Sequence, residues 1–196
     1  MASPRVSRRS TDWPIRSSQA KAIASGIEPR LMITDRPPEF NQIADAQVKR
    51  AFLGKGPDCV ILLPPGTKLY KWSKSMLGRN GISPWWLLLE SRMLPNGKRF
   101  DGLKERQEYA KRLSVSDKDF HRVRAGVTRQ WNPMTRPIAI QLDNPAWAYV
   151  GKAAGQLEDN DMADVYFIAG DYQLWIPGLK AVDVRQISIV PYLSTA

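Results

Sequence analysis

Two carboxylates adjoin apolar runs of the sequence and are the first candidates for chemistry. Glu90 follows the run 85–89, and Asp171 precedes the run 172–176. A carboxylate in such a place lies either at the exposed end of a strand or in a cleft, where it can act as an acid or a base. Further acids gather in the segment 158–164, a charge run that is typical of a solvated loop.

Cations and aromatic side chains are interleaved in the segment KLYKWSK at 68–74. Such a pattern can place stacking rings beside phosphate-binding ammonium groups. The wider region 71–136 carries fifteen Lys and Arg against six acids, whereas 137–179 carries one against six. Two interpretations stay open. The two regions neutralise each other, or the basic region 68–136 binds an anionic ligand, nucleic acid or an acidic partner.

Several large enzyme classes are excluded by the motifs that the sequence lacks. It has no G-x-x-x-x-G-K-[ST], no G-x-G-x-x-G after a strand and no G-x-S-x-G, which argues against most nucleoside triphosphatases, dehydrogenases and α/β-hydrolases. With Cys59 and His121 as the only residues of their types, we expect no internal disulfide and no metal site. We expect Cys59 to be a buried small apolar residue and His121 to be a structural residue on a helix.

The elements that must position these residues follow from the apolar periodicity. It predicts strands at 60–63, 68–72, 85–89, 137–142, 164–169, 171–176 and 184–190. The helical period and capping residues predict helices at 39–53, 103–113, 116–131 and 144–157. The continuous apolar run 60–63 is typical of a strand that is buried on both faces. The order of elements indicates an α+β fold, with mixed or antiparallel strands in two small sheets and about four helices.

The chain is expected to divide into a basic flexible N-terminal arm at 1–38 and a single α+β domain at 39–196. The arm is dominated by Ser, Arg and Pro, and its few apolar residues cannot offset the entropy lost on ordering. No apolar run approaches the ~20 residues of a membrane span, and no secretory signal peptide is visible. We therefore expect a cytoplasmic protein, or one that is delivered into a target cell without a classical signal peptide.

Three short patterns, namely LYKW at 69–72, Ser83 before an aromatic strand and DYQLWIPG at 171–178, resemble the ADP-ribosyltransferase-like fold of bacterial toxins and effectors. LYKW at 69–72 is similar to the family's L-Y-[R/H] strand, whose cation holds the dinucleotide. Ser83 opens an aromatic strand, as in the family strand that shapes the nicotinamide pocket. DYQLWIPG at 171–178 stands where the family carries E-x-E, or a lone catalytic Glu, shortly before an apolar-Pro-Gly segment.

The resemblance implies a site for NAD as a substrate, with no metal. The dinucleotide-binding residues would be Tyr70, Lys71, Ser83 and Trp85. The catalytic residues would be Asp171, Gln173 and Glu90. Lys71 stands in place of Arg or His, and Gln173 stands where the family has Glu. Because a neutral amide cannot supply the charge that stabilises an oxocarbenium-like ribose, Asp171 or Glu90 would act instead.

The resemblance further implies a bacterial effector or toxin-type domain, either an ADP-ribosyltransferase or an NAD glycohydrolase. Its partners would be a protein target and an immunity or assembly protein. Two other functions stay open. One is a non-enzymatic basic protein that engages nucleic acid or an acidic partner through 68–136. The other is a structural component of a larger assembly, for which a basic arm and a compact domain are also suited.

Overall fold

The computed structural model describes residues 39–40, 46–78, 81–129, 131–158 and 165–193 of the 196-residue chain. The arm predicted at 1–38 lies outside these residues, and so does most of the acidic run 158–164. The described residues belong to one compact unit, Met32–Ala196. None of the helices in the described part is long and apolar enough to cross a membrane.

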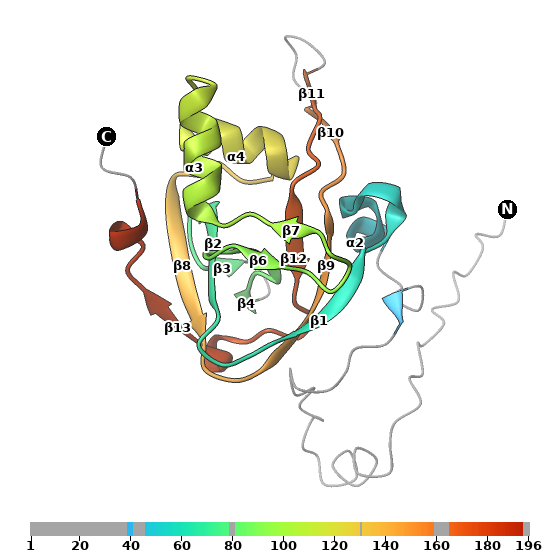
Figure 1. Cartoon of the computed structure of the whole chain (residues 1–196), viewed down its shortest axis with the longest axis vertical. Helices are drawn as coiled ribbons and strands as arrows, with labels where there is room; N and C mark the ends of the chain where they lie inside the picture. Colours follow the sequence, from blue (N-terminus) through green and yellow to red (C-terminus); the bar gives the residue numbers. More distant parts are fainter. Residues whose placement is uncertain (1–38, 41–45, 79–80, 130, 159–164, 194–196) are drawn as a thin grey trace, which may run out of the picture. The chain divides into compact units, whose positions relative to one another are not determined.

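Seven antiparallel strands form the main sheet, in the order β1-β9-β12-β5-β2-β8-β13 (Figure 1). Their bounds are β1 Cys59–Leu63, β2 Lys68–Ser73, β5 Trp85–Leu88, β8 Arg136–Leu142, β9 Ala146–Lys152, β12 Tyr172–Trp175 and β13 Val184–Ile187. β5 joins the two halves of the sheet, because its first two residues pair with β12 and its last two with β2. The predicted α+β class with antiparallel strands is confirmed, but one large sheet replaces the two small sheets.

Short ribbons and helices complete the described fold. The ribbons pair β3 Leu77–Gly78 with β4 Gly81–Ile82, β6 Arg92–Met93 with β7 Arg99–Phe100, and β10 Gln156–Glu158 with β11 Val165–Phe167. The α-helices are α2 Ala46–Ala51, α3 Leu103–Arg112 and α4 Asp117–Ala125. Short 3-10 helices are η2 Leu53–Lys55, η3 Ala181–Asp183 and η4 Val190–Tyr192. Figure 1 shows α3 and α4 side by side above one end of the sheet.

The predicted starts of α3 and α4 agree with the structure, but the predicted end of α4 does not. α3 lies within the predicted helix 103–113. α4 begins after its predicted cap, since the Ser116 hydroxyl oxygen accepts a hydrogen bond from the Asp119 N–H at 3.1 Å. The predicted end at 131 is wrong, because Gly126 adopts a left-handed conformation with φ 61° and terminates the helix. Trp131 consequently lies beyond the end of the helix and is 64% exposed.

The helix predicted at 144–157 is wrong, because strand β9 occupies Ala146–Lys152. Asn144 and Pro145 provide a helix-start signal, but β9 pairs with β1 on one side and β12 on the other. The hydrogen bonds of a central strand and burial of nearly all its side chains outweigh a local capping preference.

Strand β1 is not buried on both faces, which corrects the prediction for 60–63. It lies at one edge of the sheet, and Val60 and Leu62 are 37% and 44% exposed. Ile61 and Leu63 alternate with them and face the main core. A second, smaller core contains Val48, Phe52 and Tyr149, on which the partly buried aromatics Phe40, Trp85 and Trp175 pack.

Candidate functional site

The three segments that carry the sequence patterns occupy three adjacent strands of the sheet. Lys71 lies on β2, Trp85 on β5 and Gln173 on β12, and these strands follow one another in the order β12-β5-β2. Antiparallel pairing places Leu174 of β12 opposite Trp86 of β5. Sheet pairing therefore brings together three segments that span about a hundred residues of sequence, at the point where β5 joins the two halves.

Lys71 is a buried cation at the centre of this region. The residue is 9% exposed, and its Nζ lies 4.6 Å from the centroid of the Trp86 ring. Among the residues that the structure describes, no carboxylate lies within ion-pair distance of Lys71. Burial lowers the pKa of Lys71 to about 8. The ammonium is thus a desolvated charge that an aromatic face stabilises without a described counter-ion.

Ser83 holds the start of β5 and fixes the ring beneath Lys71. Its carbonyl oxygen accepts a hydrogen bond from the Trp86 Nε1–H at 2.6 Å, and its hydroxyl oxygen accepts one from the Trp85 N–H at 3.3 Å. Trp85 packs in the smaller core, with ring centroids 5.5 Å from Phe52 and 6.3 Å from Trp175. The predicted binding residues therefore divide into two groups, Lys71 with the Trp86 ring and Trp85 within the aromatic cluster.

Tyr70 does not face a ligand cleft. It is 1% exposed, and its hydroxyl has no hydrogen-bond partner within the described residues. The ring lies 6.0 Å from His121 and borders a void of about 10 Å³ beneath α3 and α4, which is room for about one water. Burial raises the pKa of Tyr70 and lowers the pKa of His121 to about 3. Both side chains are therefore neutral residues of the interior at physiological pH.

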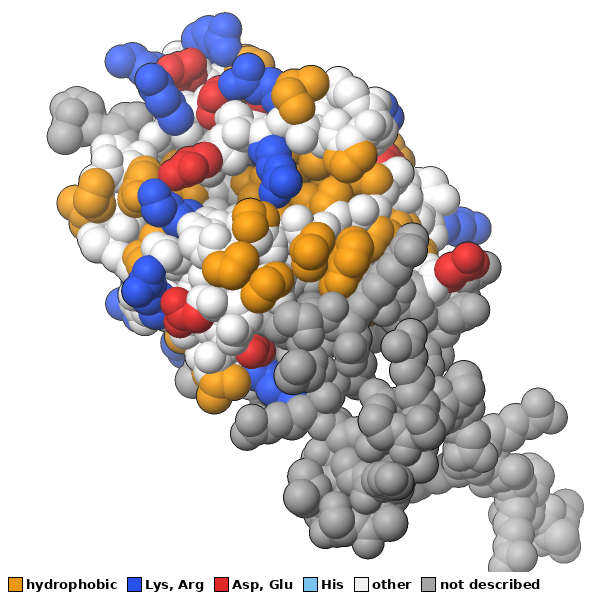
Figure 2. Space-filling model, turned by 60° about the horizontal axis from the view of Figure 1, so that its bottom comes forward, with side chains coloured by type: hydrophobic (Ala, Val, Ile, Leu, Met, Phe, Trp, Pro, Cys, Tyr) orange, Lys and Arg blue, Asp and Glu red, His pale blue; other side chains and the backbone are white. Residues whose placement is uncertain are grey.

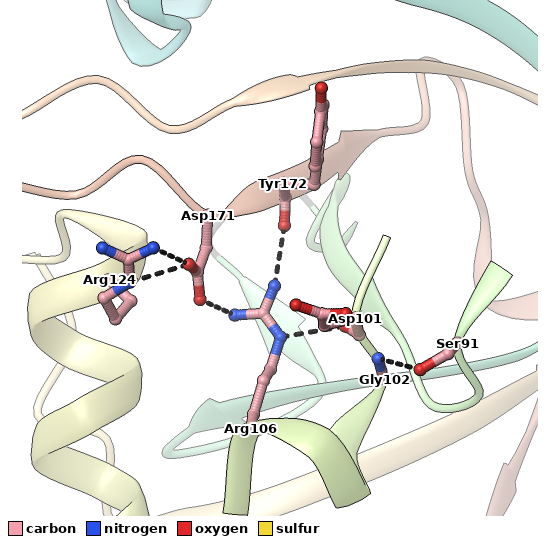
Figure 3. A network of polar contacts seen from close by, with 7 residues as sticks. All are labelled: Ser91, Asp101, Gly102, Arg106, Arg124, Asp171 and Tyr172. Atoms are coloured by element: carbon pink, nitrogen blue, oxygen red, sulfur yellow. Dashed lines mark hydrogen bonds and ion pairs between the residues drawn. The ribbon is translucent and has the colours of Figure 1, made fainter. Parts of the chain in front are cut away.

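Asp171 is the centre of an ion-pair network that joins β12 to both long helices (Figure 3). One carboxylate oxygen contacts Arg106 of α3, and the other accepts a hydrogen bond from Arg124 Nε of α4 at 2.7 Å. Arg106 also donates to the carbonyl oxygens of Asp101 at 3.0 Å and Tyr172 at 3.1 Å. The Arg106 side chain is 5% exposed and that of Asp171 is 13% exposed. Two guanidinium groups thus already balance this carboxylate.

The other two predicted catalytic residues have separate partners. Gln173 Nε2 donates to the carbonyl oxygen of Ala51 at 2.8 Å and ties β12 to the end of α2. Glu90 follows β5, its side chain is 69% exposed, and its Oε1 lies 3.0 Å from Lys68 Nζ. Asp171, Gln173 and Glu90 therefore do not share a described partner, and Glu90 is the more exposed of the two acids.

Sequence reasoning missed the residues that hold the candidates in place. Trp86 supports Lys71 directly, and only the strict alternation of a strand could have separated its role from that of Trp85. The sequence shows Arg106 and Arg124 only as parts of a basic region, because nothing local in it pairs them with an acid that is distant in the chain.

Part of the positive charge of 68–136 is neutralised within the fold. Lys98 pairs with Asp58 at 3.2 Å, and Arg99 pairs with Glu105 at 2.6 Å. The networks of Asp171 and Glu90 occupy three further cations. Among the described residues, no group of three or more His, Cys, Asp or Glu side chains is arranged to hold a metal ion.

Comparison with known proteins finds two similar solved structures. No protein-family model matches the chain, and no curated protein sequence matches it. Rhs1-CT, solved in complex with its cognate immunity protein RhsI1, has a TM-score of 0.39 and 17% identity, over 68% of this chain and 81% of that one. Tse6, solved in complex with Tsi6, has a TM-score of 0.39 and 15% identity, over 87% and 91%. A TM-score of 0.39 assigns neither fold nor activity, and the proposals below stand on this chain's own residues.

Proposed function

We propose that the chain is an effector-type domain that binds NAD where β2, β5 and β12 adjoin and cleaves its nicotinamide–ribose bond. The observation that carries this proposal is Lys71, a buried ammonium on the Trp86 ring with no described carboxylate partner. A desolvated charge is costly unless it is paired, and perturbed ionisable groups concentrate at functional sites. Lys71 is also the residue that takes the place of the dinucleotide-binding cation in the family that the sequence resembles.

A dinucleotide matches the chemistry of these residues. Its pyrophosphate would supply the negative charge that Lys71 lacks. Trp85 and Trp175 pack against the smaller core, on the other face of the sheet from Trp86 and Lys71, so they support the strands of the site and do not contact the same ligand. Dinucleotide binding thus relies on the cation of β2.

The proposed reaction breaks the bond between nicotinamide N1 and ribose C1′. The electron pair of that bond leaves with the nicotinamide, and positive charge develops on the ribose. Water, or a nucleophilic atom of a target protein, forms the new bond at C1′ and releases its proton to solvent. A carboxylate near the ribose lowers the barrier because it stabilises the oxocarbenium-like transition state.

We assign the carboxylate role to Glu90 and a positioning role to Asp171. The two arginines that contact Asp171 already balance its charge, so it has little negative charge left to offer a ribose cation. Glu90 is exposed, and within the described part of the chain its ion pair is with Lys68, which is itself partly exposed. That ion pair can open at small cost, since exposed pairs contribute about 0–1 kcal/mol.

The test is nicotinamide release from NAD by the full chain, followed by chromatography, together with NAD affinity from calorimetry. Lys71→Met should weaken NAD binding by at least about tenfold, roughly the 1.4 kcal/mol of a weakened charge contact. Lys71→Arg should retain binding, and Lys111→Met, which removes an exposed cation of α3, should change nothing. Glu90→Gln should lower turnover but not NAD affinity. Equal NAD binding by Lys71→Met and the unaltered chain would refute the proposal.

A further inference from the structure

Strand β1 is an apolar edge strand without the usual protection. Among the described residues it pairs with β9 on one side and with no strand on the other, so it lies at one edge of the sheet. Its sequence, CVILL, contains no charged residue and no proline. Natural edge strands avoid pairing with other chains by charges, prolines or bulges, because an open edge exposes unpaired backbone N–H and C=O groups. The composition of β1 is that of a strand whose free edge is covered in use.

A groove of about 380 Å³ lies beside this strand, between β1 and the start of the β6–β7 ribbon. Val60 and Leu62 line one side, and Met93 and Pro95 line the other. β1 runs along the lower side of the molecule in Figure 1. Figure 2 shows this side turned toward the viewer, and hydrophobic side chains gather on it. The groove falls within the size range of functional binding sites. Six of its seven lining residues are hydrophobic, and polar atoms make up more of its exposed lining than apolar atoms do.

We propose that this β1 groove binds an extended segment of an acidic protein partner. The segment would add a strand to the free edge of β1, and its alternate apolar side chains would cover Val60 and Leu62. Recognition of this kind takes affinity from backbone hydrogen bonds and specificity from the side-chain contacts. The proposal is independent of the proposed NAD chemistry, because none of its residues belongs to the β2–β5–β12 region.

The positive charge of Arg92 beside the groove favours an acidic partner. Arg92 lines the groove and is exposed, and among the described residues no carboxylate lies within ion-pair distance of it. Neighbouring Lys98 and Arg99 are already paired with acids of this chain. An aspartate or glutamate of the incoming segment can pair with Arg92 at the rim, which favours an acidic partner over a neutral one.

The chain's own charge disfavours the two other occupants. A second copy would bring a net charge of +10 and another Arg92 to the interface. Residues 1–30 carry six cations against two acids, so this segment would bring a net charge of +4. Both would add like charge beside Arg92, which is repulsive at short range.

The test uses a fluorescein-labelled heptapeptide of alternating valine and glutamate, and the same peptide with lysine in place of glutamate. Fluorescence anisotropy with the full chain should give saturable binding of the glutamate peptide, and at least about tenfold weaker binding of the lysine peptide. Arg92→Glu should reverse this preference. The reversal is specific to an ion pair at the groove, since a general charge effect on a +10 chain would survive one substitution.

Leu62→Lys is the matching variant for the apolar contact. Its side chain is 44% exposed, so the fold should be retained, and a lysine on the edge should abolish binding of the glutamate peptide. Leu113→Lys, at a position 64% exposed at the end of α3, is the control and should bind normally.

Three results would overturn the proposal. The first is a failure of the binding test, in which either the glutamate peptide does not bind at millimolar concentration or Leu62→Lys binds it as tightly as the unaltered chain does. The second is a dimer in light scattering of the full chain that Leu62→Lys abolishes, which would make a second copy the occupant. The third is slow hydrogen exchange at every β1 amide of a monomeric full chain without peptide, which would place a segment of the chain itself on the edge.

Discussion

Replacing Lys71 with methionine should stabilise the fold while it weakens ligand binding. Methionine is unbranched and of similar length, so it can occupy the same space on the Trp86 ring without a buried charge. The pKa of Lys71 falls from the ordinary value of 10.5 to about 8. At 1.36 kcal/mol per pH unit, keeping the ammonium charged at neutral pH costs the folded state roughly 3 kcal/mol. The contact with the indole returns about 1–2 kcal/mol, so we expect a net gain of about 1–2 kcal/mol.

The pH dependence gives this prediction a definite sign. Between about pH 8 and pH 10.5 the unfolded chain holds a proton that folded Lys71 has released. The free energy of unfolding of the unaltered chain should therefore rise with pH across this window, relative to that of Lys71→Met. The advantage of the variant should be largest at pH 7 and should disappear by about pH 10.

Urea unfolding followed by tryptophan fluorescence at several pH values measures both quantities. The difference between the two proteins at each pH isolates Lys71, because the other titrating groups are common to both. A variant that is less stable than the unaltered chain at pH 7 would refute the reasoning, and so would a difference that does not change with pH. Either result would mean that Lys71 is stabilised by more than the ring beneath it, and the motive for an anionic ligand would be removed.

Three further predictions concern the support of this region. Asp171→Ala should lower the free energy of unfolding by about 3–5 kcal/mol, because it leaves Arg106 buried without its carboxylate partner. Urea titration measures this loss, and a smaller loss would mean that the ion pair is dispensable. His121 has a pKa of about 3 in the folded chain and about 6.5 in the unfolded chain, so the free energy of unfolding should fall by about 2 kcal/mol from pH 6.5 to pH 5. His121→Phe should remove most of this pH dependence. An unchanged pH dependence in the variant would contradict the prediction. Ser116→Ala should lower the free energy of unfolding by about 1 kcal/mol, because α4 loses its N-cap hydrogen bond. Thermal unfolding measures this change, and an unchanged melting temperature would show that the cap does not stabilise the fold.

The local patterns of the sequence were sufficient for some elements. The alternating segment 68–72 became β2, and the helix 103–113 became α3. The α4 start followed from Ser116 and the residue three positions later. These elements agree with the prediction because their hydrogen bonds, caps and apolar periodicity are determined within a few residues of the chain.

The failures have a common cause in long-range pairing. The segment 144–157 has local features of a helix, yet β9 forms because two other strands flank it. The exposed faces of Val60 and Leu62 follow from the edge position of β1, and an apolar run in the sequence carries no information about which strand ends a sheet. The separate surroundings of Asp171, Gln173 and Glu90 also depend on which distant element of the chain supplies the partner of each.

By itself the sequence determined an α+β chain, the α3 helix and the cap of α4, and it left mixed and antiparallel strands open. It determined these because short-range hydrogen bonding and periodicity are encoded in neighbouring residues. The tertiary structure alone decided that Lys71 lies on Trp86 without a described carboxylate, that two arginines balance Asp171, and that β1 leaves an apolar edge beside Arg92. Each of these depends on contacts between segments distant in the chain, and the free energy of such contacts exists only once the sheet has assembled.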